Sequence, residues 1–223
     1  MLRQAKHVFK LDPQKNITDA SLEATLTSQT DLIMISGTDG VTRQNISDLL
    51  ERIKSFNLDK SIALEISHPD TVVPGFDYYY VPSVINTKNI KYAHGLLIEA
   101  LMEYHEFIEY ENIRLLPYIV MNEHCKAFNR AECTLMNDEE FLAAIHMLDK
   151  LYKMDFIYVE YSGTYGDYAL VKEAFDACEN SHLLYGGGIQ SHSEATQMAK
   201  VSDTIVVGNI IYDDIEQALT TII

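Results

Sequence analysis

Residues 183–209 have the sequence LLYGGGIQSHSEATQMAKVSDTIVVGN, in which two short apolar runs each end at glycine. We predict that Leu183–Gly187 and Thr204–Val207 are buried β-strands, because short apolar runs bounded by turn residues are typical of parallel sheets. The segment between them, Ser193–Lys200, has a helical pattern. A strand, a helix and a second strand in this order indicate an α/β fold with parallel strands.

The same alternation of strands and helices runs through the rest of the chain. Eight strands in 223 residues favour a compact (β/α)8 TIM barrel over an open, doubly wound sheet. We expect residues 1–223 to form one domain. The other strands are predicted near His7–Asp12, Asp31–Thr38, Ser61–Ser67, Tyr78–Ser83, Leu115–Met121 and Phe156–Ser162, and the other helices near Thr18–Gln29, Thr42–Phe56, Lys88–Glu109, Asp138–Met154, Asp167–Cys178 and Asp213–Thr220.

The connection after the third strand breaks this pattern. Between the third and fourth strands the chain contains Pro69, Pro74 and Gly75. Proline removes a backbone donor and clashes with the preceding helical turn, and glycine favours a turn over a helix. The barrel is therefore predicted to lack the outer helix that would follow its third strand.

The composition excludes several classes of partner. The chain has 33 acidic and 17 basic residues, which gives a formal net charge of −16. Nucleic acids and anionic lipid surfaces attract basic proteins, so neither is an expected partner. The three cysteines form no CxxC pair, which predicts a reducing, cytoplasmic location. The sequence shows no signal peptide and no apolar run long enough to cross a membrane.

Polar side chains gather at the predicted C-terminal ends of the strands, where the active sites of such barrels lie. Because side chains alternate along a strand, Lys10 and Asp12 share the inward face of the first strand, while Phe9 and Leu11 face the helices. Asp12 precedes Pro13, so a role in a turn is its alternative. The same alternation directs inward Ser36 and Thr38 of the second strand and Tyr158, Glu160 and Ser162 of the sixth. Glu65 and Ser67 share one face of the third strand, and Tyr118, Val120 and Asn122 share one face of the fifth; Ser67 and Asn122 are expected only to solvate the mouth or to cap helices.

Glycines end the last two strands, at Gly186–Gly188 and at Gly208, which Asn209 follows. The loops after strands seven and eight of a barrel commonly bind phosphate through backbone N–H groups, and glycine lets the backbone approach the anion. Ser162 and Gly163 could supply further donors. We therefore predict a phosphate site here, which would provide the local positive potential that an anionic substrate needs on an acidic protein.

Several of these segments resemble one protein family along nearly the whole chain. The family is that of the geranylgeranylglyceryl phosphate synthases, and the bacterial heptaprenylglyceryl phosphate synthases are its most similar branch. The segments are HVFKLDP (7–13), SGTDGVT (36–42), VPGFDYYYVPSVINTKN (73–89), YVEYSGTYGD (158–167), YGGGI (185–189) and VVGN (206–209).

The resemblance implies a fold, a reaction and a set of site residues. It implies a modified (β/α)8 barrel without one outer helix, in agreement with the connection after the third strand. The implied enzyme is a Mg²⁺-dependent prenyltransferase, a homodimer, that joins sn-glycerol 1-phosphate to heptaprenyl diphosphate and releases diphosphate. Asp12 and Thr38 would hold Mg²⁺, and glycerol 1-phosphate would be bound by Lys10, Tyr158, Val159, Glu160, Tyr161, Ser162, Gly163, Gly188, Gly208 and Asn209.

The chemistry of such a transfer agrees with the residue types. Loss of diphosphate builds negative charge on the leaving group, which a metal ion on Asp12 and Thr38 would stabilise. The attacking glycerol hydroxyl must lose a proton, and Glu160 is the expected catalytic base. The prenyl chain needs an apolar groove, which the predicted Lys88–Glu109 helix and the gap left by the missing helix could form. A lipid substrate also predicts transient contact with a membrane.

Two other classes of function remain as alternatives at this stage. A phosphosugar isomerase or a flavin-binding barrel would share the phosphate site, but it would not need Asp12 or a prenyl groove. A non-catalytic docking barrel would not need Lys10, Asp12 and Glu160 to converge. The prenyltransferase is the reading that uses all of these features.

Overall fold

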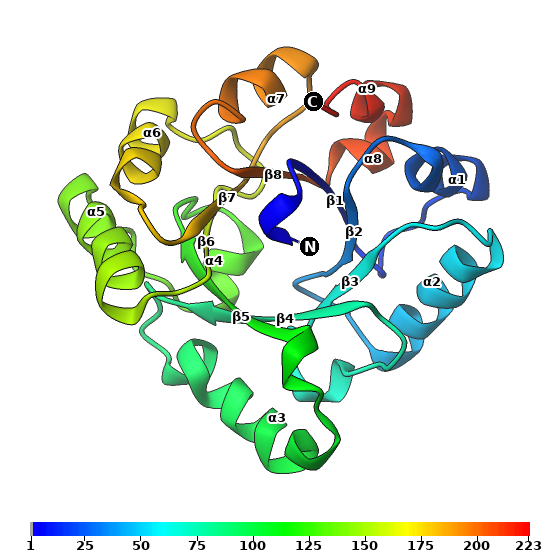
Figure 1. The fold of residues 1–223 in the computed structure, drawn as a ribbon, viewed down its shortest axis with the longest axis horizontal. Coiled ribbons are helices and arrows are strands. Elements are labelled where there is room, and N and C mark those ends of the chain that lie inside the picture. Colours follow the sequence, from blue (N-terminus) through cyan, green and yellow to red (C-terminus); the bar gives the residue numbers. More distant parts are fainter. Residues whose placement is uncertain (1) are drawn as a thin grey trace.

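Eight parallel strands close into a barrel in the order of the sequence (Figure 1). The computed structural model describes residues 2–223, apart from the side chain of Phe107. The barrel closes where β8 pairs with β1, His7 lying opposite Ile205. The predicted TIM-barrel fold is confirmed. The strands are β1 (His7–Leu11), β2 (Leu32–Ile35), β3 (Ile62–Glu65), β4 (Tyr78–Val84), β5 (Ile113–Val120), β6 (Phe156–Glu160), β7 (His182–Gly186) and β8 (Thr204–Val207).

The alternation of side chains along each strand divides the core into two layers. Phe9 and Leu11 of β1 pack outward against the helices, as predicted, together with Ile157 and Val159 of β6. Val8 points inward and packs with the other side chains that fill the barrel. This division follows from the period of two in a strand, and it carries the polar residues at the strand ends to the inside.

Most helices of the outer ring begin at a residue that caps their backbone N–H groups. Thr42 and Asn137 form capping boxes, and the Asp167 side chain accepts from the N–H groups of Ala169 and Leu170. The helices are α1 (Asp19–Thr27), α2 (Arg43–Ser55), α3 (Leu96–Tyr104), α4 (Lys126–Arg130), α5 (Asp138–His146), α6 (Tyr168–Ala177), α7 (His192–Met198), α8 (Ile210–Asp213) and α9 (Ile215–Leu219).

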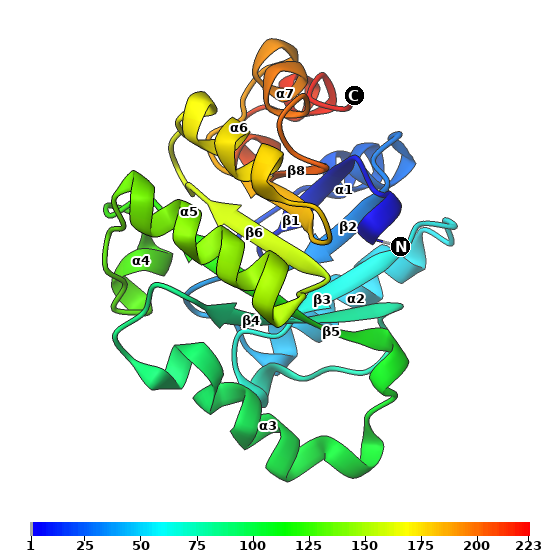
Figure 2. The same cartoon turned by 60° about the vertical axis from the view of Figure 1, so that its left-hand side comes forward.

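The connection between β3 and β4 contains one short 3₁₀ turn, Pro69–Thr71, in place of an outer helix. The predicted loss of the third helix is therefore confirmed. The following helix, α3, stands away from β4 and β5 instead of packing closely on them (Figures 1 and 2). No residue of α3 is buried, although the helix is rich in leucine, isoleucine and methionine. An apolar helix that is not packed on the barrel leaves a space beneath it.

The N-terminal segment closes the end of the barrel opposite the candidate site. Residues Leu2–Gln4 form a 3₁₀ turn, and in Figure 1 this end of the chain lies in front of the barrel's centre. Leu2 and Ala5 are buried and pack with Tyr80 and Phe156 in the inner layer. Access to the barrel interior is therefore from the C-terminal ends of the strands. In residues 2–223, no helix has both the length and the apolar character needed to span a bilayer.

Candidate active site

A cavity of about 1560 Å³ opens at the C-terminal ends of the strands. Its polar end lies over β1 and the loops after β6, β7 and β8. Its apolar end lies between α3 and the strands β4 and β5. The apolar lining includes Ile66, Val81, Val84, Leu96, Leu97, Ala100, Leu101 and Leu115. One continuous cavity can therefore hold a molecule with a charged head and a long apolar tail.

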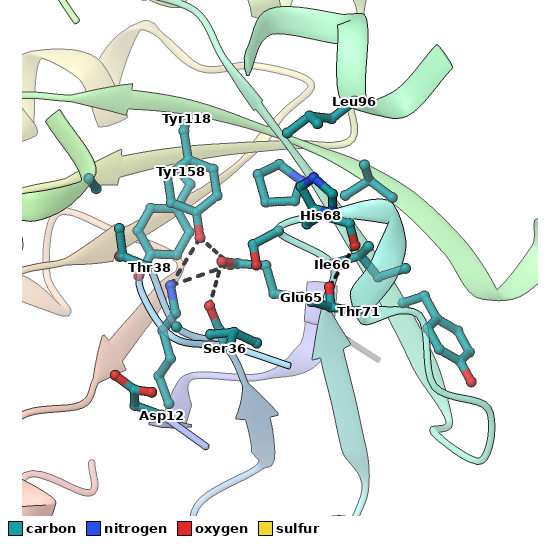
Figure 3. Close-up of a pocket in the computed structure, with 18 of the residues that line it drawn as sticks. Asp12, Ser36, Thr38, Glu65, Ile66, His68, Thr71, Leu96, Tyr118 and Tyr158 are labelled. Atoms are coloured by element: carbon teal, nitrogen blue, oxygen red, sulfur yellow. Dashed lines mark hydrogen bonds and ion pairs between the residues drawn. The ribbon is translucent and has the colours of Figure 1, made fainter. Parts of the chain in front are cut away.

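A network of charged and hydroxyl groups forms the floor of the polar end (Figure 3). The Lys10 amine lies 3.4 Å from the Glu65 carboxylate and 3.3 Å from the Tyr118 hydroxyl. The Ser36 hydroxyl donates to Glu65 at 2.6 Å, and the Tyr118 hydroxyl donates to the same carboxylate. The network therefore joins side chains from four strands or their ends: β1, the end of β2, β3 and β5.

Two stacked tyrosines support this network. The rings of Tyr118 and Tyr158 lie 4.3 Å apart and within 17° of parallel. The Lys10 nitrogen lies 5.5 Å and 5.3 Å from their ring centroids, within the range of cation–π attraction. Burial raises the pKa of both phenols well above the usual value, so both remain protonated hydrogen-bond donors.

Glu160 is a buried carboxyl group at the end of β6, and it faces the cavity. Its carboxylate accepts a 2.7 Å hydrogen bond from the backbone N–H of Ser162. Burial raises the pKa of Glu160 to about 7, and the negative charge of Glu65 acts in the same direction, whereas the Lys10 ammonium lowers it. A carboxyl group with a pKa near neutrality is well suited to accept a proton at physiological pH. Glu160 also interacts electrostatically with four other ionisable side chains: Tyr118, Tyr158, Tyr185 and Cys125.

Asp12 and Thr38 also line the cavity, on the side of the view opposite His68 and Thr71 (Figure 3). The Asp12 carboxylate packs against Gly37, where a Cβ would lie 2.7 Å from its Oδ1 atom. Within residues 2–223 there is no group of three or more histidine, cysteine, aspartate or glutamate side chains arranged for a metal. The oxygen donors of one carboxylate and one hydroxyl nevertheless fit Mg²⁺, which is commonly held by one or two carboxylates together with substrate phosphates.

The predicted phosphate loops bring their backbones against the same end of the cavity. Gly163 and Gly188 have φ angles of +83° and +58°, which favour glycine. A Cβ at Gly188 would lie 2.2 Å from the backbone nitrogen of Tyr165, so only glycine fits between these loops. Gly208 and Asn209 complete the rim, and the Asn209 side chain accepts a 2.9 Å hydrogen bond from Lys15.

The structure thus brings together most of the residues that we predicted for the site. Lys10, Asp12, Thr38, Tyr158, Glu160, Ser162, Gly163, Gly188, Gly208 and Asn209 all line the one cavity. The side chains of Val159 and Tyr161 do not, because they point outward into the layer between the strands and the helices. Neither residue contributes to the lining of the cavity, and the Tyr161 backbone N–H donates to the Gly186 carbonyl.

Glu65 and Tyr118 are central to the site, but our sequence reasoning gave them no role there. Alternation along the strands only grouped each of them with its neighbours on one face of a strand. A signal was available for Glu65, since a carboxylate at the inward C-terminal end of a barrel strand is costly to bury without a partner. The partner, Lys10, lies 55 positions earlier, and sequence alone gives no reason to pair the two.

The class of protein that this site defines is a (β/α)8 barrel with an elongated, two-ended cavity at the carboxyl ends of its strands. A model of the PcrB family matches residues 1–223. The heptaprenylglyceryl phosphate synthase of Oceanobacillus iheyensis is 41% identical over 216 residues, which are 97% of this chain and 94% of that protein. The chain belongs to the PcrB family.

Solved structures give the same fold. The (S)-3-O-geranylgeranylglyceryl phosphate synthase of Thermoplasma acidophilum, solved in complex with sn-glycerol-1-phosphate, superposes with a TM-score of 0.82 over 98% of this chain and 93% of that chain. The GGGPS of Thermoplasma volcanium gives 0.81 over 98% of this chain and 92% of that chain. Both are 18% identical to this chain, so they support the fold and not individual residue roles.

Proposed function

We propose that this protein is a prenyltransferase that joins sn-glycerol 1-phosphate to a long polyprenyl diphosphate, with heptaprenyl diphosphate as the preferred donor. The observation that carries the proposal is the single cavity with a polar end and an apolar end. Membership of the PcrB family and the name of the Oceanobacillus iheyensis relative support the same reaction. The alternative barrel enzymes would not use the apolar end beneath α3.

The residues of the polar end have distinct roles in this proposal. The backbone of the loops at Gly163, Gly188 and Gly208 would hold the phosphate of glycerol 1-phosphate, which places its glycerol beside Glu160. Glu160 would accept the proton of the attacking hydroxyl as its oxygen bonds to the first carbon of the prenyl chain and the bond from that carbon to diphosphate breaks. Holding both substrates in one cavity makes the encounter effectively intramolecular.

Asp12 and Thr38 would hold Mg²⁺ at the diphosphate. When bound there, the ion would stabilise the negative charge of the leaving group as a Lewis acid. The Lys10 ammonium, two residues before Asp12 on the same strand face, adds fixed positive charge at this end. These groups supply a local positive site on an otherwise acidic protein, whose formal net charge is −16.

The test is direct incubation with radiolabelled glycerol 1-phosphate, Mg²⁺ and prenyl diphosphates of several lengths. We expect label to move into the organic phase, as an ether-linked prenylglyceryl phosphate, most efficiently with heptaprenyl diphosphate. Label that stays in the aqueous phase with every donor would contradict the proposed reaction.

The phosphate loop after β8 can be tested with one methyl group. At Gly208 a Cβ would lie 3.3 Å from the Lys10 carbonyl oxygen, a tight but tolerable contact, whereas Gly188 has no room for one. We expect Gly208→Ala to raise the KM for glycerol 1-phosphate about 10-fold, by weakening backbone hydrogen bonds worth about 1.5–3 kcal/mol to a charged group. The KM for the prenyl diphosphate should not change.

Gly95→Ala is the matched control for this variant, because Gly95 lies outside the cavity and a Cβ there meets only ordinary contacts at 3.4 Å or more. Steady-state kinetics with each substrate varied in turn separates the two KM values. An equal rise in both KM values would place the Gly208 loop outside the glycerol phosphate site.

The apolar end predicts a determinant of chain length on α3. Ala100 lines the cavity between Leu96, Leu97 and Leu101, and its small side chain leaves room for a long substrate. We expect Ala100→Trp to shift the ratio of kcat/KM from heptaprenyl toward geranylgeranyl diphosphate, since each excluded CH₂ group forfeits about 0.8 kcal/mol of burial. Activity with the shorter donor should be retained.

Glu99→Trp places the same bulk on the neighbouring exposed position and should leave the ratio unchanged. The measurement is competition between the two donors in one reaction, read by product mass. An unchanged ratio in Ala100→Trp, with both activities retained, would place the end of the prenyl chain elsewhere in the cavity.

The lipid nature of the donor and product extends the proposal to the protein's surroundings. The outer side of this region exposes Ile90 and Met102, 65% and 78% accessible, beside the apolar end of the cavity. If this side contacted a membrane transiently, the prenyl chain could pass between the bilayer and the cavity with less exposure to water. The cytoplasmic location and the homodimer stay predictions.

A further inference from the structure

The Glu65 carboxylate is buried at the floor of the cavity, and the proposed reaction has so far given it no role. Its side chain is 7% exposed. The Ser36 and Tyr118 hydroxyls donate hydrogen bonds to it, and the Lys10 ammonium forms an ion pair with it at 3.4 Å. Two hydrogen bonds and one ion pair compensate the burial of this carboxylate, so the barrel can contain the charge. They do not explain what the charge does there.

The position of the Lys10 nitrogen depends on this carboxylate. The nitrogen lies 3.4 Å from Glu65, and 3.3 Å from the Tyr118 hydroxyl that itself donates to Glu65. A lysine side chain is flexible, and its ammonium group is a point charge without a preferred direction of contact. The ammonium therefore keeps one position only if a fixed partner holds it. Other neighbours are the rings of Tyr118 and Tyr158, which attract a cation over a broad face and do not select one direction. The Glu160 carboxyl also interacts electrostatically with Lys10, but in the part of the chain that the structure describes no ion pair joins the two groups.

The backbone of Lys10 also adjoins both proposed anion sites. Its backbone carbonyl oxygen is 3.3 Å from where a Cβ of Gly208 would lie, and Asp12 follows it by two positions on the same face of β1. Without an anchor, the ammonium would be drawn toward whichever phosphate binds first. The ammonium would then stabilise one bound substrate in the ground state. It would no longer lie where negative charge develops in the transition state.

We propose that Glu65 is a positioning residue for the prenyl transfer, and that it holds the Lys10 ammonium at the cavity floor between the glycerol phosphate site and the diphosphate site. This inference rests on the proposed function for its kinetic consequence. The anchoring of Lys10 itself does not depend on which reaction the protein catalyses.

Glu65→Gln removes the charge while an amide oxygen can still accept from Ser36. We expect kcat to fall about 10²-fold, the usual cost of displacing a catalytic group by about 1 Å. The KM values for both substrates should stay within a few-fold of the wild-type values, because a released Lys10 can still reach a bound phosphate. General loosening of the barrel would instead raise both KM values and lower the Tm.

Two comparisons separate anchoring from loss of structure. In a Lys10→Met background, adding Glu65→Gln should cause almost no further fall in kcat, because residues that act as one unit are strongly non-additive. Thr204→Val is the control, since it removes a hydroxyl from another buried polar pair, with His182, outside the cavity. It should lower the Tm and retain kcat.

A readout without turnover tests the anchor directly. Competitive acetylation of the whole folded protein, followed by mass spectrometry, gives the relative reactivity of each lysine. We expect Lys10 to react slowly in the wild type and several-fold faster in both Glu65→Gln and Tyr118→Phe, with Lys60 as an internal standard. Tyr118→Phe removes only the bridging hydroxyl, so it provides the test if Glu65→Gln does not fold.

The two levels of the proposal fail in different ways. Unchanged acetylation of Lys10 in the folded variants would overturn the anchoring, whatever the reaction. Faster acetylation with a kcat equal to the wild type, or with losses that simply add in the double variant, would overturn the positioning role. A wild type that reacts slowly at Lys10 but transfers no prenyl group would contradict the proposed function and leave the anchor supported.

Discussion

Replacement of Asp12 by asparagine is expected to lower the rate of prenyl transfer by about 10²–10³-fold without unfolding the protein. Metal stabilisation of a leaving group is worth several kcal/mol, and each 1.4 kcal/mol is a factor of ten in rate. Asparagine keeps an oxygen that can accept the 3.0 Å hydrogen bond from the Gln14 backbone. The backbone of Asp12 stays bound to the Tyr212 hydroxyl, so local structure should survive.

A second measurement separates the metal role from other causes of inactivity. Mn²⁺ can replace Mg²⁺ as a paramagnetic probe, and its binding in the presence of inorganic diphosphate can be followed by electron paramagnetic resonance. Asp12→Asn should weaken that binding, whereas Asp59→Asn, which removes an exposed carboxylate outside the cavity, should not. Full activity of Asp12→Asn, or of the wild type in excess chelator, would contradict the assignment of the metal site.

Most of the site could be predicted because it follows from the period of a strand. Once β1 and β6 are placed, alternation directs Lys10, Tyr158 and Glu160 inward and Val159 and Tyr161 outward. The rule that barrel sites lie at the C-terminal strand ends then collects the inward residues at one mouth. Proline and glycine after β3 were sufficient to predict the missing helix, since their effect on the backbone is local.

The parts that could not be predicted depend on contacts between distant segments. The pairing of Glu65 with Lys10 and Tyr118 exists only because closure of the barrel brings β1, β3 and β5 around one axis. The position of α3 away from the strands is likewise a tertiary result. The sequence predicted a helix over Lys88–Glu109 that could line a groove, but not that α3 would have no buried residue. The short helix α4 was not predicted at all, because five residues carry too little periodicity.

Replacement of Glu160 by glutamine is expected to lower kcat by about 10²–10⁴-fold, which is the usual contribution of a general base. Glutamine has nearly the same shape and can still accept from the Ser162 backbone, but it cannot take a proton from the glycerol hydroxyl. The KM for glycerol 1-phosphate should therefore stay within a few-fold of the wild-type value. Glu173→Gln on α6, an exposed position outside the cavity, serves as the control and should behave as the wild type.

The pKa of Glu160 gives this prediction a distinctive pH dependence. In the wild type, kcat/KM should rise with pH up to about 7, because a base must be ionised to act, and this limb should vanish from the residual activity of Glu160→Gln. Stability should show the opposite trend. The folded pKa of about 7 lies above the ordinary 4.5, so the folded protein binds more protons between these values, and ionisation of Glu160 costs stability as pH rises through this window.

That cost is about 3 kcal/mol above pH 7 and is absent below pH 4.5. Glutamine does not ionise, so the Tm of Glu160→Gln relative to the wild type should be several degrees higher at pH 8 than at pH 5. Thermal unfolding at the two pH values, with Glu173→Gln alongside, measures this difference. A Tm difference that does not change with pH would show that Glu160 titrates near its ordinary value, and a wild-type kcat in Glu160→Gln would exclude it as the base.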